Sequence, residues 1–332
     1  MNKKAVVLFS GGLDSTLATK LIIDQGVEVV ALNFMSPFCR CDRSKGCGSG
    51  IKKMADQLGV EFKSVYLGQN YLEIVKNPKH GYGKNINPCI DCRILKFKKA
   101  KEFMKEIGAA FVITGEVLGQ RPMSQHRRAL QTIEKEAGLQ GLILRPLSAK
   151  LFSPTIPEQN NWVDRESLLN ISGRTRRPQI KLASSYGLKD YPCPAGGCLL
   201  TDPTFSRRLK ELIEYGDFNI ANVELLKLGR HFKINSSCKF VVGRDEKENI
   251  KLKNFLQEDD LYFEPTKLSG PSGLLRGRWD NEIKNIAAKI IAQYTSKEQK
   301  VEVSILNISD KNEDKIDAEA IQESMSRKLM IL

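Results

Sequence analysis

The first part of the chain alternates short apolar runs with longer amphipathic segments. Residues 5–9 (AVVLF) and 27–34 (VEVVALNF) are almost wholly apolar, which predicts two buried β-strands. Between them, the apolar positions of residues 16–26 (TLATKLIIDQG) recur at helical spacing, and a helix should end at Gly26. This strand–helix–strand order is typical of an α/β domain with a parallel sheet.

The same alternation continues further along the chain. Helical spacing predicts helices at residues 51–60 and 93–108, and strands are expected at residues 61–68 and 109–116. We therefore expect one α/β domain with a parallel sheet over residues 1–203.

The pattern changes near residue 200. We expect helices at 202–216 and 281–296 and short strands at 238–244, 260–265, 272–279 and 300–308. These elements predict a small α+β domain over residues 204–298, followed by a C-terminal extension over 299–332. The last 25 residues are polar, so we expect them to be loosely ordered.

Composition sets the broad class of the protein. The 332 residues are 41% hydrophobic and 27% charged, which are ordinary values for a globular protein. The longest early apolar run, Ala5–Phe9, is too short for a signal-peptide core or a membrane span, and no later run approaches one. We expect a cytoplasmic protein with no membrane partner.

The net charge of +13 points to a polyanionic partner, because releasing counterions from phosphates favours clustered Lys and Arg. Residues 171–189 and 226–244 each contain five basic residues and no acidic one. A solubilising surface is the alternative explanation. The clustering favours nucleic acid.

Seven of the eight cysteines precede residue 200, and several lie in close pairs; they stand at positions 39, 41, 47, 89, 92, 193, 198 and 238. In a reducing compartment a disulfide framework is not expected, so the distribution suggests catalysis or metal binding. Cys238 lies in a predicted strand and should be a buried apolar residue.

A glycine-containing turn joins the first strand to the first helix. In residues 9–16 (FSGGLDST), Gly11 and Gly12 allow a tight turn, and the helix N-terminus adds partial positive charge. Hydroxyl groups come from Ser10, Ser15 and Thr16. Together these features predict an anion-binding loop, although it has neither the Walker nor the Gly-x-Gly-x-x-Gly pattern.

The Ser-Gly-Gly-x-Asp-Ser order resembles the loop of the PP-loop (N-type) ATP pyrophosphatases, which have an adenine nucleotide α-hydrolase-like fold. The resemblance implies that ATP is cleaved to AMP and pyrophosphate, with Asp14 helping to hold Mg²⁺. It also implies that adenine lies at the end of the second strand, near Asn33 and Phe34. Gly115 is a further candidate for nucleotide contact.

Later motifs resemble tRNA thiolation enzymes. Residues 87–97 (NPCIDCRILKF) and 196–201 (GGCLLT) are similar to the two cysteine elements of the tRNA 2-thiouridylases, with Cys92 and Cys198 at the cysteine positions. Residues 114–125 (TGEVLGQRPMSQ) and 144–150 (LRPLSAK) instead resemble the 4-thiouridine synthetases. The likeness spans roughly residues 4–201.

Cys89 is an addition to the 2-thiouridylase pattern. With Cys92 and Cys198 it gives three thiolates, the arrangement of the iron–sulfur-dependent tRNA thiolases. That resemblance implies a 4Fe–4S cluster with three protein ligands and one iron open to hydrosulfide. The sulfur would come from sulfide or from a cysteine desulfurase.

Other roles for the cysteines stay open. Cys193 with Cys198 would complete a four-cysteine zinc site, and Cys193 is also an alternative third cluster ligand. In a persulfide mechanism Cys92 would accept sulfur and Cys198 would resolve it, although no rhodanese domain is evident. The three cysteines at positions 39, 41 and 47 are either a separate metal site or a loop near the adenylate.

Two groups of residues are candidates for tRNA binding in the first domain. Gln120 and Arg121 follow the C-terminal end of a strand, where open α/β sheets bind ligands. The second group, just upstream of Cys198, comprises Arg174, Arg176 and Arg177.

The C-terminal part resembles NFACT-type RNA-binding domains in residues 239–252 and 270–277. The resemblance adds Arg230 and Lys239 as RNA-binding candidates. A dimerisation domain, and therefore a homodimer, is the alternative.

These features together predict an ATP-dependent tRNA sulfurtransferase that adenylates a uridine carbonyl oxygen and replaces it with sulfur. The Gly-Gln-x-x-x-Ser-Gln element should lie at the ligand face, so we expect 4-thiouridine at position 8. The alternative is a 2-thiouridylase of the wobble position. Other classes are an RNA-binding module without catalysis and a thiolase acting on a small molecule.

Overall fold

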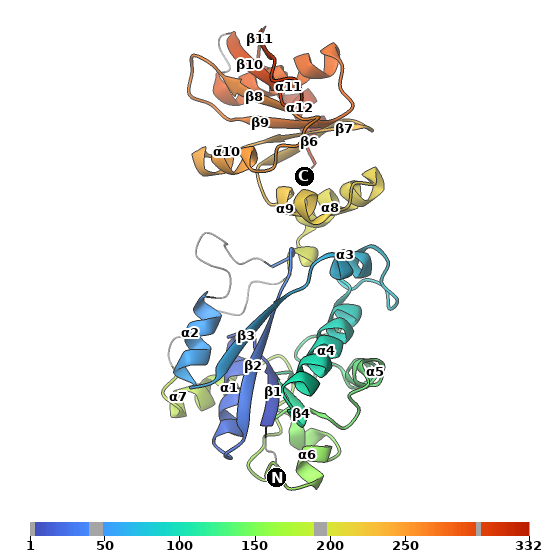
Figure 1. The fold of residues 1–332 in the computed structure, drawn as a ribbon, viewed down its shortest axis with the longest axis vertical. Coiled ribbons are helices and arrows are strands. Elements are labelled where there is room, and N and C mark those ends of the chain that lie inside the picture. The colour runs from blue at the N-terminus through green and yellow to red at the C-terminus, as the bar shows by residue number, and fades with distance from the viewer. Residues whose placement is uncertain (1–3, 40–48, 189–197, 297–299, 332) are drawn as a thin grey trace. The chain divides into compact units, whose positions relative to one another are not determined.

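The computed structural model describes residues 4–39, 49–188, 198–296 and 300–331. The chain forms two compact units, Met1–Thr201 and Asp202–Leu332 (Figure 1), which are described separately.

The first unit is built on a five-stranded parallel sheet with the order β3-β2-β1-β4-β5. The strands are β1 (Lys4–Leu8), β2 (Glu28–Met35), β3 (Glu61–Tyr66), β4 (Phe111–Thr114) and β5 (Ile143–Leu144). β1 lies at the centre, where Val6 is paired with Val30 on one side and Val112 on the other. The predicted α/β fold with a parallel sheet is confirmed.

Helices cover both faces of this sheet (Figure 1). They are α1 (Leu13–Ile23), α2 (Ser49–Gln57), α3 (Gln69–Lys76), α4 (Cys89–Glu106), α5 (Arg127–Ala137), α6 (Ile156–Gln159) and α7 (Arg177–Ser185). Because side chains alternate along a strand, Ala5 and Val7 pack with α1 and α7, while Val6 packs with α4 and α5. The sequence pattern predicted neither α3 nor α5, and it placed the start of α4 four residues too late.

The strand order fixes the place of the candidate site. The chain moves outward from β1 to β2 and β3 and then returns to the other side of β1 as β4. In open parallel sheets a ligand binds where the order reverses, outside the carboxyl ends of the two diverging strands. Here those ends lead into the loops that begin at Phe9 and Gly115.

The second unit is an antiparallel six-stranded sheet with the order β11-β10-β8-β9-β7-β6. Its strands are β6 (Arg230–Asn235), β7 (Cys238–Val242), β8 (Leu261–Pro265), β9 (Gly273–Gly277), β10 (Val301–Asn307) and β11 (Glu313–Ala318). Its helices are α8 (Pro203–Tyr215), α9 (Ile220–Leu225), α10 (Glu246–Lys253), α11 (Asn281–Thr295) and α12 (Glu323–Leu329).

Apolar side chains of α11 pack on one face of this sheet, against Phe240 and Phe263 among others. Cys238 is fully buried in β7, as predicted. The C-terminal segment differs from the prediction of loose order. Its strand β11 pairs along six residues with β10, because Ile316 and Ala318 add apolar contacts to the core.

Among the helices in the described part of the chain, none combines the length and apolarity needed to cross a membrane.

Candidate active site

The loop between β1 and α1 has the backbone geometry of an anion cradle. Gly11 has φ +67°, in the left-handed region that favours glycine, and a Cβ there would meet Ile51 at 3.2 Å. Ser15 Oγ donates to the Gly12 carbonyl at 2.9 Å and lies 3.1 Å from Ser10 Oγ. The loop therefore gathers two hydroxyls and the free N–H groups of a helix N-terminus.

Asp14 lies in the first turn of α1, and Gln120 Nε2 donates to its Oδ2 at 3.1 Å. Its Oδ1 and Thr16 Oγ1 are buried and have no hydrogen-bond partner in the described structure. A buried carboxylate oxygen without a partner suits Mg²⁺, which prefers oxygen ligands. The residues present therefore fit a phosphate-bound Mg²⁺ at Asp14.

Gly115 follows β4 and touches the phosphate loop directly. A Cβ on Gly115 would lie 2.5 Å from the carbonyl carbon of Asp14 and 2.5 Å from Ser15 N. Only a residue without a side chain lets the two loops approach this closely. Gly115 thus shapes the loop from outside; its predicted contact with the nucleotide stays a prediction.

Asn33 and Phe34 lie near the end of β2. Asn33 is buried, and its Nδ2 donates to the Phe9 carbonyl at 2.8 Å, so it fixes the backbone where the phosphate loop begins. Phe34 packs against the apolar cluster beneath α4. The Asn33 Nδ2 and the Phe34 ring are thus engaged within the protein, the Asn33 Oδ1 is buried without a partner among the described residues, and backbone contact with adenine stays a prediction.

Cys89 and Cys92 lie in the first turn of α4, and the Cys92 N–H donates to the Pro88 carbonyl at 2.9 Å. Residues three apart share a helix face. Cys198 lies near the C-terminal end of the first unit in sequence. Its Sγ lies 3.8 Å from the Phe38 carbonyl oxygen, and this oxygen also accepts a hydrogen bond from Leu199 N at 3.0 Å.

The three thiols converge on Tyr71 of α3, a helix that packs against α4 (Figure 1). Burial raises the pKa of Tyr71 well above its usual range, and Cys92, Cys198 and Cys89 raise it further, so all three thiols lie within electrostatic reach of its hydroxyl. Cys39 also lies within electrostatic reach of Cys198. We call Cys89, Cys92 and Cys198 the thiol pocket.

Burial governs the protonation of two of these thiols. It raises the pKa of Cys198 to about 12. Burial and the neighbouring Cys92 also raise the pKa of Cys89, and the cations Arg93 and Arg121 partly oppose this shift. Cys89 and Cys198 are therefore neutral thiols near pH 7 unless a metal displaces their protons.

Three thiols in one partly buried pocket are the donor set of a Cys₃ iron–sulfur site. As the described side chains stand, no three His, Cys, Asp or Glu are placed to hold one metal ion. The three thiols therefore fit a cluster by the chemistry of their donor atoms and not by their present placement. Cys41, Cys47 and Cys193 lie outside the described residues, and with them the zinc alternative.

Arg121 connects the phosphate loop with the thiol pocket. Partial desolvation of its guanidinium and the neighbouring Arg93 lower the pKa of Arg121, while Cys89 and Asp14 raise it. Arg121 thus lies within electrostatic reach of both sites.

Arg93 is held by the buried carboxylate of Glu116, which also accepts from Arg145 Nε at 3.0 Å. Tyr71, Arg93 and Glu116 were not predicted as site residues from the sequence. Arg93 and Glu116 lie inside the quoted motifs at residues 87–97 and 114–125, whereas Tyr71 lies in none of them.

The two groups of predicted tRNA-binding residues in the first unit lie near one another. Leu118 forms a parallel bridge with Ser172, and the Gly173 N–H donates to the Leu118 carbonyl at 2.7 Å. This contact brings the basic segment next to the loop of Gln120 and Arg121. Arg174 and Arg177 are exposed and Arg176 is half-buried.

Arg230 and Lys239 are engaged inside the second unit. The Arg230 guanidinium lies 4.5 Å from the ring centroid of Tyr294 and donates to the Gly243 carbonyl at 3.1 Å. Lys239 Nζ is buried 4.9 Å from the Tyr215 ring centroid, and burial lowers the pKa of Lys239 to about 8. RNA binding by Arg230 and Lys239 stays a prediction, and the buried place of the Lys239 amine does not favour it.

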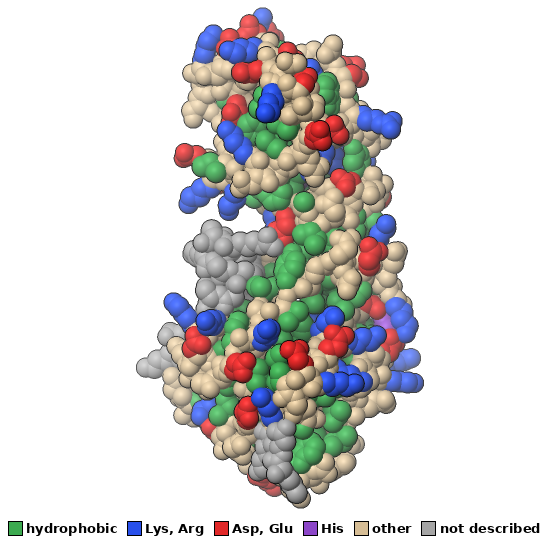
Figure 2. Space-filling view, in the orientation of Figure 1, with side chains coloured by type: hydrophobic (Ala, Val, Ile, Leu, Met, Phe, Trp, Pro, Cys, Tyr) green, Lys and Arg blue, Asp and Glu red, His purple; other side chains and the backbone are tan. Residues whose placement is uncertain are grey.

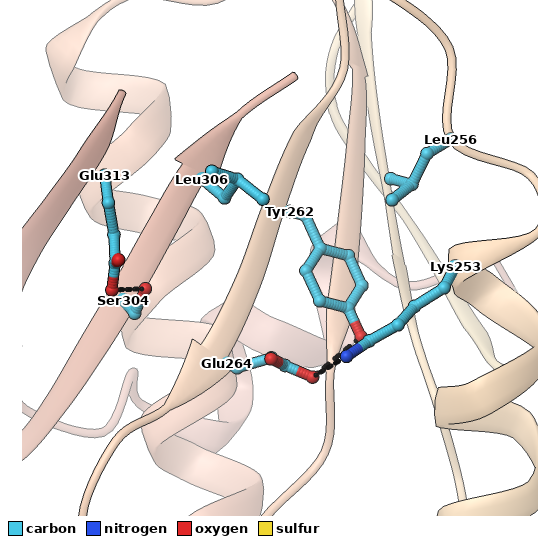
Figure 3. Close-up of a pocket in the computed structure, with 7 residues that line it drawn as sticks. All are labelled: Lys253, Leu256, Tyr262, Glu264, Ser304, Leu306 and Glu313. Atoms are coloured by element: carbon cyan, nitrogen blue, oxygen red, sulfur yellow. Dashed lines mark hydrogen bonds and ion pairs between the residues drawn. The ribbon is translucent and has the colours of Figure 1, made fainter. Parts of the chain in front are cut away.

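The second unit has a hollow of about 240 Å³ between α10 and the strands β8 and β10 (Figure 3). Glu264 there accepts from the Tyr262 hydroxyl at 2.9 Å and pairs with Lys253 Nζ at 3.1 Å. On the other side Ser304 Oγ donates to Glu313 at 2.7 Å. The polar groups drawn in Figure 3 are thus paired with one another, and the pocket contains no thiol.

Charge is distributed without a single dominant patch on one face. Among the described side chains drawn in Figure 2, Lys and Arg are interspersed with Asp and Glu over α4 and α5. The net charge of +13 is thus not concentrated on this face.

The sheet order and the phosphate loop give the first unit the fold of the PP-loop ATP pyrophosphatases, and a small C-terminal domain with an antiparallel sheet follows it in the chain. A family model described as thiamine biosynthesis protein (ThiI) matches residues 1–150. Another, described as NFACT protein RNA binding domain, matches residues 229–330. The predicted resemblance to PP-loop tRNA thiolation enzymes with a C-terminal RNA-binding domain is confirmed.

The chain is also similar to individual proteins and solved structures. The chain is 25% identical to the tRNA-specific 2-thiouridylase MnmA 1 of Caldanaerobacter subterraneus, over 90% of this chain and 86% of the relative. A 4-thiouridine synthetase in complex with RNA and ATP is 26% identical over 40% of this chain and 34% of that one, with a TM-score of 0.34. The U34-tRNA thiolase NcsA of Methanococcus maripaludis, solved with its 4Fe–4S cluster, is 19% identical over 68% of this chain and 73% of that one, with a TM-score of 0.35.

Proposed function

We propose that this protein is an ATP-dependent tRNA sulfurtransferase that replaces a uridine carbonyl oxygen with sulfur. The observation that carries the proposal is the pairing of two sites on one unit. The phosphate loop contains Asp14, the thiol pocket contains Cys89, and Arg121 lies within electrostatic reach of both residues.

The reaction has two displacements. The uracil carbonyl oxygen attacks the α-phosphorus of ATP, a new P–O bond forms, and pyrophosphate leaves with the electrons of the broken bond. A sulfur nucleophile then adds to the carbon, and AMP leaves with the original oxygen. Both steps require charge to be stabilised on phosphate oxygens.

The residues of the phosphate loop bind and orient the triphosphate. N–H groups at the start of α1 and the hydroxyls of Ser10 and Ser15 donate to its oxygens. Asp14 would hold Mg²⁺, which neutralises phosphate charge when bound. Arg121 adds positive charge between the nucleotide and the sulfur, so the adenylated base is held facing the thiol pocket.

Cys89, Cys92 and Cys198 would hold the iron–sulfur cluster, which when bound supplies a site for the incoming sulfur. The partial burial of Cys89, Cys92 and Cys198 would limit the access of water to the place where the adenylate must meet sulfur rather than hydroxide. The protein's own contribution is thus to exclude water and to fix the position of the sulfur.

The proposed target is the uridine at position 8, which would become 4-thiouridine. The support is the Gly-Gln-x-x-x-Ser-Gln element: Gln120 contacts Asp14 at the phosphate loop, where the reacting carbonyl must lie. Formation of 2-thiouridine is the second candidate, and the likeness to the 2-thiouridylase of Caldanaerobacter favours it. The second unit would bind tRNA, and a homodimer formed through it is the alternative role.

Nucleoside analysis of tRNA from a deletion strain tests the activity and its target together. We expect 4-thiouridine to disappear and to return with the wild-type gene. Loss of 2-thiouridine derivatives alone would assign the second candidate. Unchanged thiouridines of both kinds would contradict the sulfurtransferase proposal.

Iron analysis tests the proposed cofactor. Protein purified without oxygen should be brown and contain iron and acid-labile sulfide, and Cys89→Ala, Cys92→Ala and Cys198→Ala should each remove colour and thiolation. Cys238→Ser is the matched control, because this buried cysteine lies in the other unit. A colourless, active preparation would favour the persulfide mechanism.

A further inference from the structure

Two loops of the first unit meet at Gly83. One loop runs from the end of α3 to the start of α4 (Figure 1), and the other follows β4 and carries Gln120. A Cβ on Gly83 would lie 3.2 Å from Met123 Cγ, so the Met123 side chain packs directly against the backbone of the first loop. The Gly83 N–H donates to the Asn87 carbonyl at 2.8 Å, which holds this loop closed on itself.

Away from Gly83, the same two loops contact both parts of the candidate active site. Gln120 Nε2 donates to Asp14 of the phosphate loop at 3.1 Å. The first loop leads directly into Cys89 at the start of α4. Its Asn85 Nδ2 donates to the Thr201 carbonyl at 2.8 Å, at the end of the segment that carries the third thiol. The loops that meet at Gly83 therefore connect the phosphate loop with both halves of the thiol pocket.

Four exposed side chains lie within two residues of this contact in the sequence, and we call them the rim: Tyr82, Lys84, Arg121 and Met123. Tyr82 is 42% exposed and Met123 is 43% exposed. A large apolar side chain exposed alone needs no explanation, but here two come from adjoining loops and each has a cation two residues away. Aromatic and apolar groups interleaved with cations are typical of surfaces that bind single-stranded RNA, because bases stack on the first and phosphates pair with the second.

Tyr82 uses its hydroxyl within the protein. This hydroxyl donates to the Val75 carbonyl at 2.6 Å and lies 3.1 Å from the Lys76 carbonyl oxygen, at the end of α3. The two contacts fix the ring while leaving much of it exposed. A ligand of Tyr82 would therefore contact the ring and not the hydroxyl, so a flat group that stacks is the ligand that fits.

We propose that the rim binds an unstacked base of the tRNA substrate, with Tyr82 and Met123 against the base and Lys84 and Arg121 near its flanking phosphates. This inference rests on the proposed function. The reacting carbonyl carbon must come within reach of both the α-phosphate and the sulfur, and a base stacked inside folded tRNA does not reach an enclosed site. A base that leaves its stack loses apolar contacts, and the rim supplies others next to the place of reaction.

The first test compares polar and conservative variants in filter binding of an unmodified tRNA transcript without ATP. Met123→Gln keeps the length of the side chain but makes it polar, and Tyr82→Leu removes the ring. Each should weaken tRNA binding about tenfold, the size of one stacked base. Met123→Leu and Tyr82→Phe should bind tRNA like wild type, because they keep an apolar side chain and a ring.

A salt series separates base contact from phosphate contact. In Met123→Gln and Tyr82→Leu the plot of log K against log salt concentration should shift in parallel with wild type, because no phosphate contact is lost. In Lys84→Gln the slope should decrease by about one. A flattened slope in Met123→Gln would overturn the proposal, since the variant would then have lost phosphate contacts instead of a base contact.

Tyr66→Leu is the matched control. Tyr66 is 41% exposed on the edge strand β3, on the far side of β1 from β4. Its substitution should leave tRNA binding unchanged, and an equal loss of binding there would contradict a specific role of the rim. Steady-state pyrophosphate release tests the adenine ring of ATP as the occupant. A higher KM for ATP in Tyr82→Leu, with wild-type affinity for tRNA, would assign the rim to adenine and overturn the proposal.

The same measurements distinguish failure of this inference from failure of the proposed function. A wild-type protein that binds tRNA and forms thiouridine, beside Met123→Gln and Tyr82→Leu variants with unchanged tRNA affinity, would overturn the rim alone. A wild-type protein that does not bind tRNA would overturn both.

Discussion

Asp91 lies between Cys89 and Cys92 in the sequence and anchors the first turn of α4. Its Oδ2 accepts from His80 N at 3.0 Å, and its Oδ1 lies 2.9 Å from His80 Nδ1. The other ring nitrogen of His80 lies 3.0 Å from Glu136 on α5. A residue that looks like a spacer in the sequence thus fixes the helix end that presents Cys89.

Asp14 offers the most direct test of the phosphate loop. Asp14→Asn keeps the size of the side chain but removes its charge, so pyrophosphate release should fall at least about 100-fold. Binding of tRNA should be nearly unchanged. The measurement is a coupled pyrophosphate assay beside filter binding.

Asp24→Asn is the control for this prediction, because Asp24 caps the opposite end of α1 and pairs with Lys20. It should keep wild-type turnover. Turnover that persists in Asp14→Asn would show that the loop is not the nucleotide site.

Gly115 should tolerate no side chain. In Gly115→Ala the new methyl group would lie 2.5 Å from backbone atoms of Asp14 and Ser15, and backbone cannot move aside as a flexible side chain can. We expect a loss of about 1–3 kcal/mol in the free energy of unfolding, measured with urea, together with slower pyrophosphate release.

Gly50→Ala is the matched substitution, since a Cβ at Gly50 has no atom within 4 Å. Its unfolding free energy should stay within about 0.5 kcal/mol of wild type. Equal losses of unfolding free energy in Gly115→Ala and Gly50→Ala would mean that the backbone of Asp14 and Ser15 can move to make room for the methyl group.

At the scale of elements, helix α4 both packs on the sheet and positions two of the three thiols. Its apolar side packs Phe97 and Ala100 onto the sheet at full burial, which fixes the direction of the helix. Its first turn is then held at the edge where β1 and β4 diverge, with Cys89 and Cys92 beside Tyr71. Packing along the length of the helix thus decides where the thiols lie.

Strand β7 carries a testable pH dependence. Burial lowers the pKa of Lys239 to about 8, against 10.5 for an ordinary lysine. Between these values the unfolded chain binds more protons than the folded one, so the contribution of Lys239 to stability increases as pH rises through this window. Below about pH 8 the ammonium is charged in both states, and its burial destabilises the fold.

Urea unfolding from pH 7 to 10.5 measures this effect in wild type and in Lys239→Met. The substitution keeps an unbranched side chain over Tyr215, and the difference in unfolding free energy between the two proteins should shrink as pH rises. A constant difference would contradict the lowered pKa. Taking the difference between the two unfolding free energies cancels the contributions from cysteine and tyrosine titration, which both proteins share.

At the scale of the whole molecule, the second unit should contribute binding rather than chemistry. Removing residues 202–332 should weaken tRNA binding and flatten the dependence of log K on log salt concentration, because phosphate contacts are lost. Filter binding over a salt series measures both quantities. Unchanged tRNA binding with loss of a dimer in sedimentation would instead assign the second unit to dimerisation.

Local sequence determined much of this protein. The two glycines after β1, the alternation of apolar runs and helical segments, and the burial of Cys238 all follow from interactions between near neighbours. Such features are encoded by backbone preferences and by side-chain periodicity, and both act over a few residues. The phosphate loop, the parallel sheet and the candidate cysteines were predictable for this reason.

Tertiary structure alone decided which of these residues meet. Cys198 joins Cys92 only because the segment after it hydrogen-bonds to Phe38, and Tyr71 enters the pocket on a helix that the sequence pattern did not reveal. In the same way Lys239 looks like a surface cation, but its amine is buried over Tyr215. Contacts between distant segments depend on how whole elements pack, and a pattern of near neighbours does not contain that information.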